Sequence, residues 1–196
     1  MMAQTEIKPS DIMDVEAYGA TRKQRRAEMV ALKKNRRLGV GPHATMYFEN
    51  YDTMLYQVQE MVFTERGGAA QIVEELEAYN PLVPKGNELV VTVMMEVEDP
   101  EKREQLLRRL GGIEETVSIE FDGEKIMADW ERDVDRTTPD GKTSAVHFLH
   151  FRFSDAQARK FRDESVRAIV AIAHPEYGHM AVIPDAMRSE LIGDLG

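Results

Sequence analysis

The 196-residue sequence contains no cysteine. Disulfides, thiolate catalysis, cysteine-ligated zinc and protein-ligated iron–sulfur clusters are therefore excluded within this chain. The sequence also lacks any apolar run approaching the roughly 18 residues that a membrane-spanning helix needs. Its first residues, MMAQTEIKPSDIMD, include no apolar segment typical of a secretory signal. We therefore expect a cytoplasmic protein that does not associate with membranes.

Several sequence motifs are missing as well. Neither GxGxxG nor GxxxxGK[ST] occurs, so there is no dinucleotide-binding or P-loop signature. The nucleophile motif GxSxG is also absent. Trp130 is the only tryptophan, and aromatic residues make up 7% of the chain, which is not typical of a stacking platform for single strands.

The charge distribution is uneven. The whole chain carries a net charge of −10, but residues 21–37 alone contribute +7, so the remaining residues carry −17. A free basic segment of this kind could bind phosphate or nucleic acid. Because the rest of the chain is so acidic, we favour a different interpretation, in which the basic helix packs on its own domain or on a partner subunit. We do not expect nucleic-acid binding.

Apolar periodicity predicts alternating helices and strands. Helices are expected over residues 16–37, 50–68, 69–79, 100–110, 155–164 and 184–195. Strands are expected over residues 44–50, 88–98, 115–121, 124–130, 144–154 and 166–173, although the last of these could instead extend the preceding helix. Turn signals include Asp122-Gly123, which joins two strands as a hairpin, and the sequence TPDGK at 138–142.

These elements predict an α+β fold. We expect a mainly antiparallel sheet of four to six strands with helices packed on it, and a basic helix near the N-terminus. Residues 1–40 would form a helical arm, and residues 41–196 a single α+β domain.

The segment NYDTMLYQVQEMVFTERGG, residues 50–68, holds the first candidate site. Its apolar residues form one helical stripe, and Glu65 falls close to that stripe, where a carboxylate needs a partner or a metal. Glu60 lies on the opposite side with Gln57, and Glu49 ends the preceding strand. Either glutamate is a candidate catalytic base. For Glu60 the alternative is a solvated position, and for Glu65 an ion pair with the basic helix.

Histidines provide a second candidate site. His147 and His150 are three residues apart on a predicted strand, so they point to opposite faces. His174 and His179 bracket the predicted turn PEYG and could converge there with Tyr177. Imidazoles at that spacing can ligate iron, manganese or zinc if a carboxylate completes the set, either the nearby Glu176 or Glu60 and Glu65 brought in by the fold. The alternative is that these are turn and surface histidines.

Several long stretches resemble a known family. IKPSDIMDVEAY, the block FEN…T…QEM…ER within residues 48–66, EELEAYNPLVPKGNELVVTVMMEVED and LGGIE are similar to an uncharacterised bacterial family, domain of unknown function 3501. Genes of that family often lie beside those of a rubrerythrin-like protein and an iron–sulfur oxidoreductase. The resemblance thus implies a link to peroxide or redox metabolism and those two proteins as partners. It implies no reaction and no catalytic residue.

Three readings of the function follow. The first is an accessory or metal-binding protein in redox metabolism. The second is a metal-free small-molecule enzyme with a glutamate base, in which Arg25 and Arg26 hold an anionic substrate. The third is a non-catalytic interaction module, expected as a homodimer. The sequence leaves the reaction, the metal and the oligomeric state open.

Overall fold

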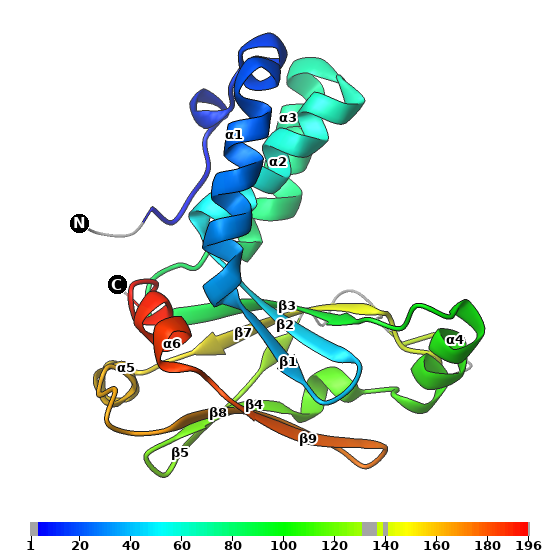
Figure 1. Cartoon of the computed structure of the whole chain (residues 1–196), viewed down its shortest axis with the longest axis vertical. Helices are drawn as coiled ribbons and strands as arrows, with labels where there is room; N and C mark the ends of the chain where they lie inside the picture. The colour runs from blue at the N-terminus through cyan, green and yellow to red at the C-terminus, as the bar shows by residue number, and fades with distance from the viewer. Residues whose placement is uncertain (1–3, 131–136, 139–140, 196) are drawn as a thin grey trace.

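The structure is a computed structural model that describes residues 4–130, 137–138 and 141–195 (Figure 1). The helices are α1 Val15–Lys33, α2 Tyr51–Glu65, α3 Gly68–Tyr79, α4 Pro100–Arg109, α5 Asp155–Phe161 and α6 Asp185–Ile192. The strands are β1 Arg37–Val40, β2 Ala44–Glu49, β3 Glu88–Met95, β4 Val117–Phe121, β5 Glu124–Met127, β6 Asp129–Trp130, β7 Val146–Arg152, β8 Ala168–His174 and β9 Tyr177–Val182. Short 3-10 turns are η1 Pro9–Asp11, η2 Lys34–Arg36, η3 Asn80–Leu82 and η4 Ile113–Thr116.

The strands form two antiparallel sheets. Sheet A has the order β1-β2-β3-β7-β6, and sheet B the order β5-β4-β8-β9. The predicted α+β class and antiparallel pairing are confirmed, but the strands divide between two sheets instead of forming one. The segment predicted as a strand over 166–173 forms β8, Ala168–His174. Residues 177–182, which the sequence did not predict as a strand, pair with it as β9. The TPDGK turn lies partly outside the described residues.

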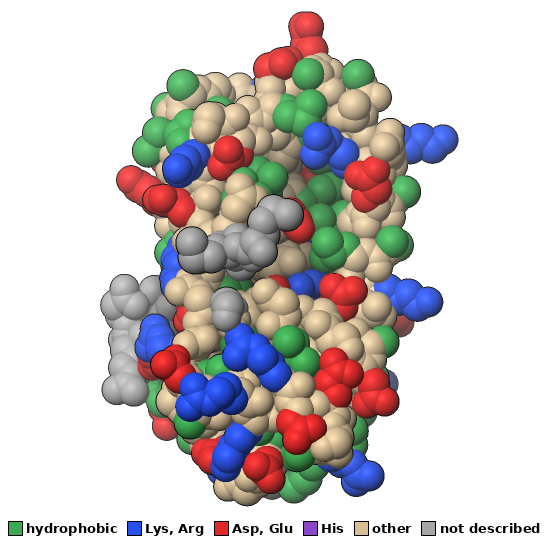
Figure 2. Space-filling view, turned by 90° about the vertical axis from the view of Figure 1, so that its left-hand side faces the viewer, with side chains coloured by type: hydrophobic (Ala, Val, Ile, Leu, Met, Phe, Trp, Pro, Cys, Tyr) green, Lys and Arg blue, Asp and Glu red, His purple; other side chains and the backbone are tan. Residues whose placement is uncertain are grey.

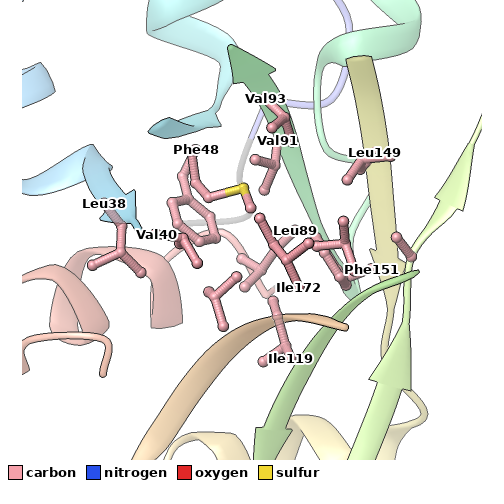
Figure 3. Close-up of a cluster of buried hydrophobic side chains, with 14 of the residues drawn as sticks. Leu38, Val40, Phe48, Leu89, Val91, Val93, Ile119, Leu149, Phe151 and Ile172 are labelled. Carbon is pink, nitrogen blue, oxygen red and sulfur yellow. The ribbon is translucent and has the colours of Figure 1, made fainter. Parts of the chain in front are cut away.

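The main hydrophobic core lies between the two sheets. Alternate residues of β2 and β3, such as Met46, Phe48 and Val91, point into it, and β4 and β8 contribute Ile119 and Ile172 from the other side (Figure 3). The two-residue side-chain period of a strand produces this arrangement. The opposite face of sheet A is therefore directed towards the helices.

Helices α1, α2 and α3 form a separate layer that projects from sheet A (Figure 1). A second core beneath them includes Met54 and Val58 of α2, Leu76 of α3 and Val90 of β3. The predicted apolar stripe of the 50–68 helix is thus its buried face. Asp14 is the N-cap of α1, because its carboxylate accepts hydrogen bonds from the N–H groups of Glu16 and Ala17. The α-helix ends at Lys33, four residues earlier than the pattern predicts.

None of the helices in the described part of the chain is long and apolar enough to cross a membrane.

Candidate functional site

A cleft of about 560 Å³ opens where β3 begins and β7 ends. Its lining includes Lys85, Glu88, His150 and Arg152, over an apolar wall that contains Phe153. Figure 2 shows one face of the molecule, with Lys and Arg side chains gathered beside Asp and Glu side chains on its lower half. The pairing of β3 with β7 creates the cluster, because it places Glu88 opposite Arg152 and His150 one pleat away on the same face.

Glu88 is the anchor of this cluster. Its Oε1 accepts a hydrogen bond of 2.7 Å from the backbone N–H of Lys85. The turn that presents this N–H depends on Gly86, whose φ of +115° is a conformation that favours glycine. Burial by itself raises the pKa of the Glu88 carboxyl, but hydrogen bonds from His150 and the Lys85 N–H outweigh it and hold the pKa below its usual value. Glu88 is therefore ionised at neutral pH.

The carboxylate of Glu88 also determines how the imidazole of His150 is used. Nδ1 of His150 lies 3.1 Å from Oε2 of Glu88, with side-chain exposures of 15% and 8%. An ionised carboxylate can only accept a hydrogen bond, so Nδ1 carries the proton. In the neutral ring Nε2 is then the acceptor, and it has no hydrogen-bond partner in the described residues. The ring is held in one orientation with its basic nitrogen free.

Two cations stand at the edge of the same cleft. Arg152 lies with Nε 3.8 Å from Oε2 of Glu88, and its guanidinium also contacts Asp129. Lys85 donates from Nζ to the carbonyl of Thr5 and retains further donors. An anionic group entering the cleft would therefore meet positive charge close to His150.

The sequence did not reveal this cluster. The strand pattern placed His147 and His150 on opposite faces, and the structure confirms it, since His147 is buried and His150 lines the cleft. Glu88 was included in the sequence prediction only as the first residue of an apolar strand. A carboxylate at the start of an otherwise apolar strand could have marked Glu88 as a candidate. Its partner His150, however, is 62 residues away in the sequence, so no local pattern joins the two.

Glu60, a candidate base, joins two helices of the upper layer. Its Oε1 accepts hydrogen bonds from Tyr18 Oη at 2.5 Å and Arg22 Nε at 3.0 Å, and its Oε2 accepts from Arg22 Nη2 at 2.8 Å. These contacts, led by the hydrogen bond from Arg22, hold the pKa of the Glu60 carboxyl below its usual value. Both oxygens are occupied, which favours a role in pinning α1 to α2 over a role as a base.

Comparison with known proteins gives a family and a structural relative. The family model described as "Protein of unknown function (DUF3501)" matches residues 6–195. The chain belongs to the DUF3501 family. A solved structure described as a novel protein of unknown function from Burkholderia pseudomallei is similar, with 35% identity and a TM-score of 0.90 over 97% of this chain and 99% of that one. None of the curated proteins matches.

The remaining candidates of the 50–68 helix are dispersed in this DUF3501 protein. Glu65 is exposed, not close to the buried stripe, and accepts a hydrogen bond from Gln71 Nε2 at 2.9 Å. Gln57 is half-buried on α2. Glu49 is buried, and its two oxygens accept hydrogen bonds from the hydroxyls of Thr53 and Thr92, both at 2.7 Å. Each of these carboxylates has its own partner.

The histidines at the predicted PEYG turn have structural partners in the DUF3501 protein. His174 Nε2 lies 3.2 Å from the carbonyl of Gly111, and the His179 ring packs on Tyr177 with centroids 4.5 Å apart. They belong to β8 and β9, on the other side of sheet A from α2 (Figure 1). Within residues 4–130, 137–138 and 141–195, no three His, Asp or Glu side chains are grouped closely enough to hold a metal ion.

In the DUF3501 protein, α1 packs along α2, and the arginines of the basic residues 21–37 differ in their partners and exposure. Arg22 pairs with Glu60, and Arg36 forms a buried ion pair with Asp194. Arg25 and Arg26 are exposed. Arg25 lines a second cleft between α1 and α2, whereas Arg26 does not line it.

Proposed function

We propose that the protein is an acid–base enzyme that moves a proton within a small anionic substrate, with His150 as the proton acceptor. The observation that carries this proposal is the hydrogen bond between His150 Nδ1 and the buried Glu88, which leaves Nε2 free in a cleft. A base oriented by a carboxylate and placed beside cations is an arrangement that general-base catalysis uses. The reading extends the metal-free enzyme predicted from the sequence, with a histidine in place of a glutamate as base.

The chemistry needs no further reactant. Lys85 and Arg152 would bind a carboxylate or phosphate of the substrate through charge-assisted hydrogen bonds. Nε2 of His150 would accept a proton from an acidic C–H next to a carbonyl, and Glu88 would stabilise the imidazolium that forms. The same proton returns to a different atom of the substrate, so the reaction is an isomerisation. Glu88 is the positioning residue, because it acts through His150.

The redox and metal-binding reading has less structural support. It derives from the family resemblance, and its proposed ligands Glu60, Glu65, His174 and His179 are divided between opposite sides of sheet A (Figure 1). No geometry in the described residues favours it over the acid–base site.

The proposal is tested by proton exchange in D₂O. Proton NMR would follow loss of the C–H signals of a panel of short 2-oxo acids and phosphorylated ketones with the wild-type protein. We expect at least one compound to exchange faster than without protein, and His150→Gln to reduce this rate about 100-fold or more. His43→Gln is the matched control, because His43 lies outside the cleft. Its rate should equal that of the wild type.

A second measurement does not depend on the choice of compound. Long-range ¹H–¹⁵N NMR of the histidines reports which ring nitrogen carries the proton. We expect Nδ1–H for His150 in the wild type and a mixture of tautomers in Glu88→Gln. Protonation of His150 on Nε2 in the wild type, or exchange that His150→Gln leaves unchanged, would contradict the proposal.

A further inference from the structure

A second cleft, independent of the His150 site, lies in the helical layer. It has a volume of about 310 Å³, and its walls are α1, α2 and residues 11–13. This volume is at the lower end of the roughly 300–1,000 Å³ range of small-molecule sites. Figure 2 shows hydrophobic side chains between charged ones over this layer. The cleft is therefore suited to a small ligand that has both apolar and charged parts.

Part of the lining of this cleft is apolar. Four aliphatic side chains line it, namely Met13, Met29, Leu32 and Leu55. Tyr18 and Tyr56 add aromatic surface from α1 and α2 respectively. The Tyr18 hydroxyl is already committed to Glu60, so the ring contributes its apolar body to the cleft. Placing a branched aliphatic or aromatic group here would be favourable, because it removes apolar surface from water.

Opposite charges stand on the two helices at its rim. Arg25 belongs to α1, and Asp52 belongs to the first turn of α2. Arg25 Nε contacts the Thr21 hydroxyl at 3.3 Å, and neither Arg25 nor Asp52 has an ion-pair partner in the part of the chain that the structure describes. Both charged groups are thus available to a ligand.

The walls are held in place before any ligand binds. Gln59 of α2 accepts a hydrogen bond from the Met13 N–H at 2.8 Å and donates to the Met13 carbonyl at 3.1 Å. Glu60 pins α2 to Tyr18 and Arg22 of α1. A preformed cleft binds more tightly because little conformational freedom is lost on binding.

We infer that this cleft binds a small amphipathic zwitterion, of which an apolar or aromatic α-amino acid is the simplest example. The ligand carboxylate would pair with Arg25, its ammonium group with Asp52, and its side chain would pack on the apolar residues of the lining. A phosphate-bearing ligand fits less well, because Arg25 is the one cation among the described residues of the lining, and Asp11, Glu28 and Asp52 would repel a multiple negative charge.

Isothermal titration calorimetry with the full chain tests the inference. The probes are L-phenylalanine, L-leucine, 3-phenylpropionate, which lacks the ammonium group, and phenethylamine, which lacks the carboxylate. We expect L-phenylalanine to bind more tightly than either analogue. Arg25→Gln should weaken L-phenylalanine about tenfold or more and leave phenethylamine unchanged, because it removes a charge-assisted hydrogen bond to the carboxylate.

The matched control is Arg26→Gln, which removes the adjacent arginine of the same helix and does not alter the lining. Its affinity for L-phenylalanine should stay within about twofold of the wild type, and thermal melting of both variants checks that they fold.

Asp52→Asn should weaken the binding of phenethylamine and leave that of 3-phenylpropionate unchanged. Absence of binding by all four probes, or equal effects of Arg25→Gln and Arg26→Gln, would overturn the assignment. His150→Gln should bind L-phenylalanine normally, which separates this inference from the proposed activity.

Discussion

Arg36 and Asp194, which lie 158 residues apart in the sequence, form a two-point ion pair inside the protein. Nη1 and Nη2 of Arg36 donate to the two carboxylate oxygens at 2.8 and 2.9 Å. Burial raises the pKa of the Asp194 carboxyl, and the hydrogen bond and charge of Arg36 counteract that rise. The pair joins η2, which directly follows α1, to a residue beyond α6, so part of the positive charge of residues 21–37 is neutralised inside the protein's own fold.

Removing one member of this pair should strongly destabilise the protein. Asp194→Asn leaves the Arg36 guanidinium buried without a counter-charge, which we expect to cost about 3–5 kcal/mol. Urea unfolding of both proteins measures the difference. Lys34→Gln is the control, because Lys34 is exposed and its replacement should change stability by less than about 0.5 kcal/mol. An Asp194→Asn variant as stable as the control would show that the pair is dispensable.

Glu60 should make stability depend on pH. Its pKa in the folded protein lies below the unfolded value near 4.5, so its stabilising contribution is present above that pH and is lost as the pH falls through the folded value. We expect the wild type to be more stable than Glu60→Gln near neutral pH, and this difference to shrink below about pH 4. Unfolding free energies measured at several pH values test this. A difference that stays constant with pH would mean that the Glu60 charge is not involved.

Tyr177, predicted as a pocket residue, fastens sheet B to the β1–β2 turn. Its hydroxyl donates to the Val40 carbonyl at 2.9 Å and accepts hydrogen bonds from the N–H groups of His43 and Ala44 at 2.8 and 2.9 Å. Tyr177→Phe should cost about 2–4 kcal/mol, because buried backbone groups lose their partner. Thermal or urea unfolding measures this. Tyr56→Phe is the control, because the Tyr56 hydroxyl has no hydrogen-bond partner among the described residues. A smaller loss in Tyr177→Phe than in this control would contradict the prediction.

Local patterns predicted the elements well where one physical rule dominates. The strand expected over residues 44–50 forms as β2, and its residues Met46 and Phe48 both belong to the core between the two sheets. The helix expected from residue 155 begins there, and Ser154 caps it by accepting a hydrogen bond from the Gln157 N–H. The Asp122-Gly123 turn joins β4 and β5 as expected.

The errors also have physical reasons. β9 was missed because its outward residues, among them Met180 and Val182, are exposed apolar groups, so no alternation of apolar and polar residues marks it. Glu65 was placed near the core because the helical wheel was extended to the end of α2. The next residue, Arg66, has a left-handed backbone with φ of 56°, which ends the helix there.

The candidate site depends on information that no local pattern contains. Glu88 and His150 meet only because β3 and β7 pair in one register, and a shift of one residue would place them on opposite faces. The same holds for Arg25 and Asp52, whose proximity to one cleft depends on how α1 packs on α2. Residue types alone could suggest candidate site residues, but the interaction partners of each candidate could be identified only from the tertiary structure.

The ion pair of Arg36 has a consequence for synthesis on the ribosome. β1 follows Arg36 directly, yet Asp194 and the fully buried Leu191 and Leu195 are translated more than 150 residues later. While most of the chain emerges, the edge of sheet A near β1 therefore lacks the C-terminal residues that pack on it. Folding of this region is coupled to the completion of residue 195, and a nascent chain stalled before that point would present an unneutralised arginine and open apolar surface to chaperones.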